Sequence, residues 1–223
     1  MNKWLSSTVD TYLKYFDAPH EPVVYEVGSR DGNDGVELAK RIYKPVYHDN
    51  LWHDGKIVLF ECNPPQQEVI KRNYPYATLI TEAISDKAGE VEFLQIHGDN
   101  NMVGSSTMNT KRSDKWIKET STIKVKTRRL DDVIKELKHT KTEIDIMKID
   151  TEGYTAEVLR SLGKYLRNVR VFQVETEITG YARAETNLDI ALFMGENGYK
   201  LVDIFYEWPP QIEDHVYVRI GDV

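Results

Sequence analysis

The sequence is poor in cysteine and contains no long apolar run. Cys62 is the only cysteine among 223 residues, which excludes an internal disulfide framework and a cysteine-based zinc site. A single cysteine makes a reducing compartment the default. No run of about 18 apolar residues occurs, and residues 1–16 lack the apolar core of a signal peptide. We therefore expect no membrane span, no secretory leader and a cytoplasmic protein.

Basic residues are also fewer than acidic ones. The chain has 29 basic and 36 acidic residues, a net charge of -7, which disfavours general nucleic-acid binding. Its length suits one α/β domain with a sizeable core, and no repeat, low-complexity tract or linker divides it. We expect a single domain over residues 1–223, with a helical extension over 1–20. The sequence does not indicate an oligomeric state.

Strand and helix patterns alternate along the chain, which favours a mostly parallel sheet covered by helices on both faces. Strands are predicted at 23–27, 57–61, 77–83, 91–95, up to about 127, 144–150, 169–175, 199–206 and 215–221. Helices are predicted at 3–16, 33–43, 65–73, 131–137 with Asp131 as its N-cap, 154–162 and 186–197. No helical pattern separates the last two strands, so they should form an antiparallel hairpin.

Three connections lack a periodic apolar pattern, and we expect them to contact the substrate. The longest is 97–120, because an ordered loop of this length in a compact domain is more often functional than decorative. A disordered surface excursion is the alternative. The polar, aromatic-rich segment 43–55 and the loop around Trp208 are the other two.

The first chemically informative stretch is VYEVGSRDG, Val24 to Gly32, where a predicted strand runs through a tight turn into a helix. Glycines at such a turn let a ligand approach the backbone, and the helix N-terminus offers unpaired N–H groups. The G-x-G-x-x-G of dinucleotide sites is missing, and the acids Glu26 and Asp31 would repel a phosphate. Acids suit a cofactor with an ammonium or sulfonium group, such as S-adenosylmethionine. An ordinary strand-turn-helix is the alternative.

The next predicted strand ends in Glu61. A carboxylate at the end of the second strand of an α/β sheet can accept hydrogen bonds from both hydroxyls of a ribose. Together with the glycine loop, Glu61 indicates a nucleoside-containing cofactor lying across the strand ends.

The second informative stretch is IDIMKIDTEGYTAEVL, Ile144 to Leu159. Alternate residues of a strand share a face, so Lys148 and Asp150 lie together at its carboxyl end, where ligands collect in open α/β sheets. A buried lysine needs a partner. Lys148 either forms a structural ion pair with Asp150 or Glu175, or orients or deprotonates the nucleophile. Glu152 either caps the next helix or acts on the substrate.

Several carboxylates therefore converge around one lysine, since Glu175 and Glu177 end the neighbouring strand. Such clusters shift one another's pKa values and can supply a general base. They can also hold a hard divalent cation, here through Asp150 and Glu175.

Other charged or metal-like patterns favour ordinary explanations. HDNLWHD, His48 to Asp54, resembles a metal cluster only weakly, and a solvated loop is favoured. The basic run Lys124, Lys126, Arg128 and Arg129 is typical of a protected strand edge, with a patch for an anionic substrate as the alternative.

These motifs, in this order, resemble the FkbM-type family of S-adenosylmethionine-dependent methyltransferases over roughly Val23 to Glu177. The stretches that carry the resemblance are VYEVGSRDG, LFECNP, AISDKAG, VKTRRLDDVI, IDIMKIDTEGYTAEVLRSLG and VFQVETE. The resemblance implies a Rossmann-like class I fold, with seven strands in the order 3-2-1-4-5-7-6. It also implies O-methylation, often of hydroxyls on sugars or natural products.

Carried onto this sequence, the resemblance implies two groups of site residues. Those expected along the cofactor are Glu26, Gly28, Ser29, Arg30, Gly32, Glu61, Cys62, Ile84, Ser85 and Asp150. Those expected at the reacting centre are Lys148, Asp150, Glu152 and Glu175. The chain departs from the family at Glu26, where aspartate is usual, and after Glu175, where many members have a histidine. The second departure argues against a histidine-assisted mechanism.

The sequence thus predicts methyl transfer from S-adenosylmethionine to a hydroxyl of a small molecule or glycan. A non-catalytic protein that binds S-adenosylmethionine or serves as a scaffold is the first alternative. A nucleotide-dependent oxidoreductase is the second, which the missing dinucleotide motif disfavours.

Overall fold

The structure is a computed structural model that describes residues 3–44, 56–97, 107–108, 120–178, 184–206 and 212–221. Residues 45–55, most of the 97–120 segment and the Trp208 loop lie outside the described residues, and so do His48 and His53. Among the described helices, none combines the length and apolar character needed to cross a bilayer.

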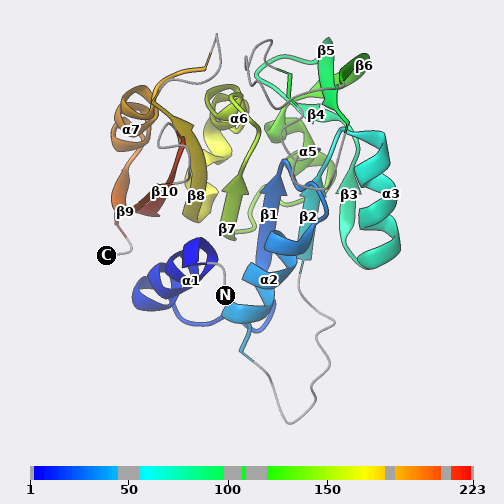
Figure 1. Cartoon of the computed structure of the whole chain (residues 1–223). Coiled ribbons are helices and arrows are strands. Elements are labelled where there is room, and N and C mark those ends of the chain that lie inside the picture. Colours follow the sequence, from blue (N-terminus) through cyan, green and yellow to red (C-terminus); the bar gives the residue numbers. More distant parts are fainter. Residues whose placement is uncertain are drawn as a thin grey trace.

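A seven-stranded sheet forms the centre of the molecule, in the order β3-β2-β1-β7-β8-β10-β9 (Figure 1). Its strands are β1 (Val23–Val27), β2 (Lys56–Phe60), β3 (Thr78–Ile80), β7 (Ile144–Ile149), β8 (Val169–Glu177), β9 (Tyr199–Tyr206) and β10 (Ile212–Arg219). The first five in spatial order are parallel, and β10 runs antiparallel to both β8 and β9. The predicted strand order and the final hairpin are confirmed.

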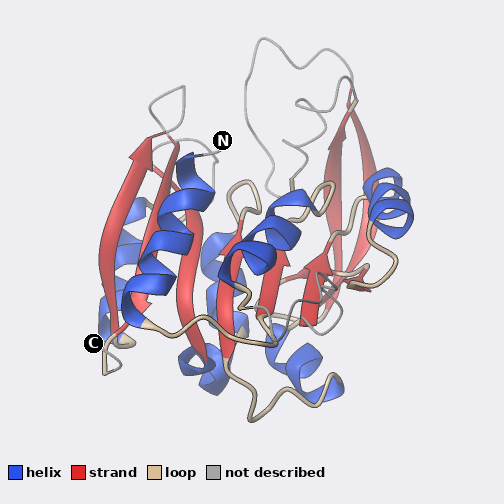
Figure 2. Ribbon diagram, turned by 90° about the horizontal axis from the view of Figure 1, so that it is seen from below, coloured by secondary structure: helices blue, strands red, loops and turns tan. Residues whose placement is uncertain are grey.

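Helices cover both faces of this sheet (Figures 1 and 2). One face packs against α1 (Lys3–Tyr15), α2 (Asn33–Ile42) and α3 (Pro64–Asn73). The other packs against α5 (Leu130–Glu136), α6 (Thr155–Ser161), a 3-10 turn over Gly163–Asn168, and α7 (Asn187–Glu196). Helix α7 begins with a capping box between Thr186 and Asp189.

The central parallel strands β1 and β7 are buried along their whole length because both faces are covered. In β1, Val24 packs into the core beneath α1 and α2, while Tyr25 and Val27 pack into the core beneath α5 and α6. All five residues of β1 and all six of β7 are buried. This explains why these strands have continuous apolar runs in place of alternation.

A smaller sheet, in the order β4-β6-β5, lies beyond the carboxyl ends of β1 and β2 (Figure 1). It contains β4 (Ala83–Ile84), β5 (Gly89–Ile96) and β6 (Thr120–Arg128). The prediction of one strand over 77–83 is therefore wrong. Ile80 pairs with Phe60, the last residue of β2, so β3 ends there. The following residues Ala83 and Ile84 pair with β6 in the second sheet.

Two local predictions concern the segment from β6 to α5. Helix α5 begins at Leu130 with Arg129 as its N-cap and without a side-chain cap, so the assignment of Asp131 as cap is wrong. Asp131 lies in the first turn, where it accepts a hydrogen bond from Arg129 (3.0 Å). Strand β4 pairs only with the last two residues of β6, so Lys124 lies on an edge that no other described strand pairs with. The interpretation of the basic run as edge protection stays a prediction.

The N-terminal helix is tied to the sheet through one buried carboxylate, Asp145. Its Oδ1 accepts hydrogen bonds from the hydroxyl of Tyr12 (2.6 Å) and from Arg170 (2.8 Å). Its Oδ2 accepts one from the backbone N–H of Val23 (2.8 Å). Asp145 is only 4% exposed, so helix α1 and the two strands beside β7 share one desolvated acceptor.

We expect Asp145→Ala to lower the free energy of unfolding by about 3 kcal/mol, because it leaves three donors, one of them charged, without their acceptor. Urea titration measures this change. Glu143→Ala is the control, because Glu143 pairs with Arg170 and Arg219 but is half exposed; it should cost less than about 1 kcal/mol. Equal effects of the two changes would show that Asp145 has no special role.

Candidate active site

A cavity opens at the carboxyl ends of β1, β2 and β7, beneath the smaller sheet. Its volume is about 570 Å³, including open solvent at the mouth. Of the residues predicted for the site, those that line it are Gly28, Arg30, Glu61, Cys62, Ile84, Asp150 and Glu152. The predicted residues that are not part of the lining are Glu26, Ser29, Gly32, Ser85, Lys148 and Glu175.

Gly28 sits where the loop after β1 crosses the end of β7. Its φ is +84°, and a Cβ at this position would lie 1.8 Å from the backbone oxygen of Asp150. The N–H groups of Gly28 and Ser29 both donate to the carbonyl of Phe60 (3.0 Å each). Only glycine fits this crossing, which brings the loop and Asp150 together at the edge of the cavity.

Ser29 and Gly32 have structural roles in the same loop. The hydroxyl of Ser29 donates to the carbonyl of Glu26 (2.7 Å) and accepts from the N–H of Phe60 (3.0 Å). Gly32 is the N-cap of α2, and a Cβ there would lie 2.8 Å from Leu59. Both residues shape the turn from within and do not line the cavity.

Glu61 is held by backbone N–H groups on each of its carboxylate oxygens. Oε2 accepts from Arg30 (2.8 Å) and Oε1 accepts from Asn63 (2.7 Å). Burial raises the pKa of Glu61 to about 7, although these N–H groups oppose the shift. Each oxygen can accept a further hydrogen bond, so the carboxylate can receive two neighbouring hydroxyls from a ligand.

The smaller sheet gives the cavity an apolar wall that the sequence did not reveal. Ala83, Ile84, Phe93 and Met108 contribute to it. Strand β5 was predicted, but nothing in its pattern showed that it would fold over the ends of β1 and β2. Ser85 follows this wall, and its N–H donates to the carbonyl of Arg128 (3.0 Å).

Cys62 lies between Glu61 and the smaller sheet, on the cavity wall. Burial, and then the charge of Glu61, raise the pKa of its thiol. The thiol is therefore protonated at neutral pH and is a poor nucleophile.

Lys148 is buried beside the cavity among three carboxylates. Its Nζ lies 2.8 Å from Asp150, 3.0 Å from Asp34 and 3.9 Å from Glu26. Burial alone would lower its pKa, but these carboxylates outweigh burial and hold the pKa of Lys148 well above its usual value. Of the two predicted ion pairs, that with Asp150 is present, whereas Glu175 is not an ion-pair partner of Lys148 among the described residues.

Two of the carboxylates around Lys148, those of Asp34 and Glu26, were not predicted to be its partners. Asp34 was missed, although an acid in the first turn after a glycine loop was a usable signal. Glu26 is 2% exposed, and its Oε2 accepts a hydrogen bond from the N–H of Gly35 in α2 (3.0 Å). Burial raises the pKa of Glu26 to about 8, although Lys148 opposes the shift. Its longer side chain reaches under α2, away from the cavity lining.

An acidic cluster closes the inner side of the site. Asp150, Glu152 and Glu175 each place a carboxylate oxygen within 4.8 Å of the others. Burial, followed by the charges of Asp150 and Glu152, raises the pKa of Glu175 well above its usual range. Burial would also raise the pKa of Asp150, but the ammonium of Lys148 prevails and lowers it.

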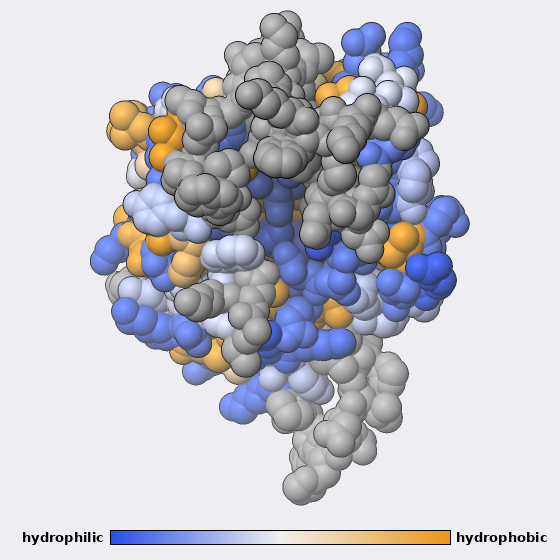
Figure 3. All heavy atoms as spheres, viewed as in Figure 1, coloured by the Kyte–Doolittle hydropathy of each residue, from blue (hydrophilic) through white to orange (hydrophobic). Residues whose placement is uncertain are grey.

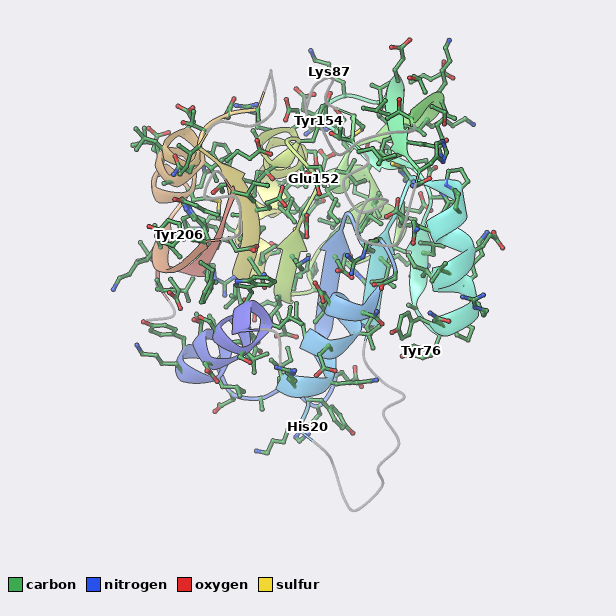
Figure 4. The ribbon with its side chains drawn as sticks, in the orientation of Figure 1. His20, Tyr76, Lys87, Glu152, Tyr154 and Tyr206 are labelled. Carbon is green, nitrogen blue, oxygen red and sulfur yellow. The ribbon has the colours of Figure 1, made fainter. Side chains whose placement is uncertain are left out.

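Glu152 does not cap helix α6, so that alternative is wrong. The N-cap of α6 is Tyr154, without a side-chain cap, and Glu152 has a left-handed φ of +51°. The hydroxyl of Thr107 donates to its carbonyl (2.6 Å). Figure 4 shows Glu152 at the carboxyl end of the sheet near the start of α6. Figure 3 shows hydrophilic residues in the middle of the face of the molecule that is seen in Figure 1.

The strand order, the cavity at the strand ends and the carboxylate after the second strand are those of the Rossmann-like class I methyltransferase fold. The family model of the methyltransferase FkbM domain matches residues 26–201. The chain belongs to this family and is a methyltransferase.

Solved structures share the fold at low sequence identity. Magnesium protoporphyrin IX methyltransferase from Synechocystis PCC 6803, solved with bound SAH, is 11% identical with a TM-score of 0.50; the match covers 96% of this chain and 81% of that one. A putative S-adenosylmethionine-dependent methyltransferase from Listeria monocytogenes is 12% identical with a TM-score of 0.48, covering 96% and 98%. No curated protein matches the chain.

We expect Gly28→Ala to lower the free energy of unfolding by about 3 kcal/mol, because it combines left-handed strain with a backbone clash. Gly195→Ala in α7 is the control, since nothing lies within 4 Å of its Cβ position and alanine favours a helix. It should be neutral or slightly stabilising in the same denaturant titration. A tolerated Gly28→Ala would show that the crossing is not tight.

Proposed function

We propose that this methyltransferase moves the methyl group of S-adenosylmethionine to a hydroxyl on a sugar or another polyhydroxylated acceptor. One observation carries the proposal. Asp150 lines the cavity, belongs to the acidic cluster with Glu152 and Glu175, and forms an ion pair with Lys148. The same residue therefore joins the space for the methyl donor to a group of hydroxyl-binding side chains.

The residues of the cavity fit the donor. Glu61 would take the two ribose hydroxyls, Ile84 and Phe93 would flank the adenine, and Gly28 would let the methionine part approach the backbone. When bound, the donor supplies a methyl group already activated by its sulfonium. Acidic surroundings suit that positive charge and disfavour a pyrophosphate.

Lys148 is assigned an orienting role in this proposal, because an ammonium held by two close carboxylates is a poor base. Asp150 would accept a hydrogen bond from the acceptor hydroxyl and hold its oxygen in line with the methyl group, which supplies most of the rate enhancement. No histidine is among the described residues that line the cavity, consistent with the departure after Glu175.

We expect Asp150→Asn to reduce turnover at least a hundredfold while donor affinity changes only a few-fold, because the amide keeps the shape but cannot accept the proton. Labelled S-adenosylmethionine with a panel of glycan and small-molecule acceptors measures turnover, and calorimetry measures affinity. Asp132→Asn, an exposed acid of α5, is the matched control. Near-normal turnover in Asp150→Asn would remove this residue from the mechanism. Donor binding without turnover on any acceptor would favour the non-catalytic alternative.

Nucleoside affinity should rise with pH around the pKa of Glu61, which burial raises to about 7. Only the ionised carboxylate can accept from both hydroxyls, so affinity should increase about tenfold from pH 6 to pH 8. Methylthioadenosine is the suitable probe, because it keeps the ribose and lacks the titrating amino acid part. Glu61→Gln should bind weakly with a flat pH profile in calorimetry. A profile in Glu61→Gln equal to that of the wild type would assign the titration to another group.

A further inference from the structure

We propose that Asp150, Glu152 and Glu175 bind one divalent cation of the oxygen-preferring class, such as Mg²⁺ or Mn²⁺, next to the donor cavity. The three residues come from two neighbouring strand ends, Asp150 and Glu152 after β7 and Glu175 in β8. Their carboxylate oxygens lie within 4.8 Å of one another, close enough to share one hard cation after small adjustments.

Glu175 gives an independent indication of a missing ligand. It is 7% exposed, and its Oε1 is completely buried with no hydrogen-bonding partner among the described residues. Buried carboxylate oxygens are normally satisfied, because leaving one without a partner is costly. The side chain interacts instead with Asp150, another acceptor. Two carboxyl groups side by side need a proton or a cation between them.

The ammonium of Lys148, the one that lies near the cluster among the described residues, does not fill this place. Lys148 lies between Asp150 and Asp34, on Oδ2 of each, and among the described residues it forms no ion pair with Glu175. Asp214 of β10 lies opposite Glu175 of β8 in the sheet, and it adds further negative charge. The local excess of carboxylates over ammonium groups attracts a cation.

The ligands are also held in position before any cation arrives. The N–H of Asp150 donates to the carbonyl of Val27 (2.9 Å), and Lys148 fixes one of its carboxylate oxygens. Thr107 holds the backbone of Glu152 in its left-handed conformation. Glu175 lies within a paired strand. Such supported ligands favour metal binding, because little ordering remains to be done.

The role of the cation, unlike its place, rests on the proposed function. Asp150 and Glu152 form part of the cavity wall, so a cation between them lies beside the methyl donor. An acceptor hydroxyl that completes its coordination is both oriented and made more acidic. A more acidic hydroxyl can be deprotonated by a weaker base. This matters here because Lys148 is held as an ammonium and cannot serve as a strong base.

Mn²⁺ binding to the full chain without donor or acceptor tests the site directly. Electron paramagnetic resonance of free Mn²⁺ gives the number of sites and the affinity, and we expect one site per chain. Glu175→Gln and Asp150→Asn should each weaken it tenfold or more, a loss that even outer-shell changes can cause. Asp214→Asn is the matched control, because it removes a neighbouring charge and no ligand; it should weaken binding at most a few-fold. Thermal unfolding checks that each variant is folded.

Two outcomes would overturn the proposal. Absence of Mn²⁺ binding in the wild type would show that Glu175 and Asp150 share only a proton. Binding that survives Glu175→Gln but is lost in His48→Ala/His53→Ala would move the site to the HDNLWHD segment. Either result leaves the proposed function intact if the protein still binds S-adenosylmethionine and transfers its methyl group, so the two failures are distinguishable.

Discussion

The site depends on the ion pairs that the ammonium group of Lys148 forms with the surrounding carboxylates. The ammonium is buried, and it holds Asp150 of the β7 end, Asp34 of α2 and Glu26 of β1 around one positive charge. Without it, three carboxylates would be crowded into a desolvated space where their mutual repulsion is large. The crossing of the glycine loop over Asp150 brings the same residue to the cavity. One lysine therefore links the core of the sheet to the donor site.

Much of this could be predicted from the sequence, because the signals are local. Buried parallel strands are continuous apolar runs, and Gly28, Glu61 and Asp150 directly follow such runs, so their common location at the strand ends follows from topology. The direction of a side chain was harder to predict. Glu26 directly precedes the glycine loop, yet its carboxylate reaches Gly35 under α2 and does not line the cavity.

The apolar wall could not be predicted, because it depends on how one sheet packs on another. Phe93 comes from a small sheet whose strands pair over long sequence separations, with β4 beside β6, and Met108 packs against that sheet. No periodicity within β5 encodes that placement. The predicted strand over 77–83 is likewise split into β3 and β4 because β2 ends opposite Ile80. The end of β2 cannot be read from the sequence of residues 77–83. Predictions failed where a residue's role is set by a distant segment.

The close contact of Glu26 with Gly35 restricts position 35 to glycine. A Cβ on residue 35 would come within 2.9 Å of the carboxylate oxygen of Glu26, 3.0 Å of its Cβ and 3.2 Å of Leu59. Aspartate has the same Cβ, so position 35 requires glycine with either acid. The longer side chain of Glu26 adds the hydrogen bond from the Gly35 N–H, which joins the end of β1 to the first turn of α2.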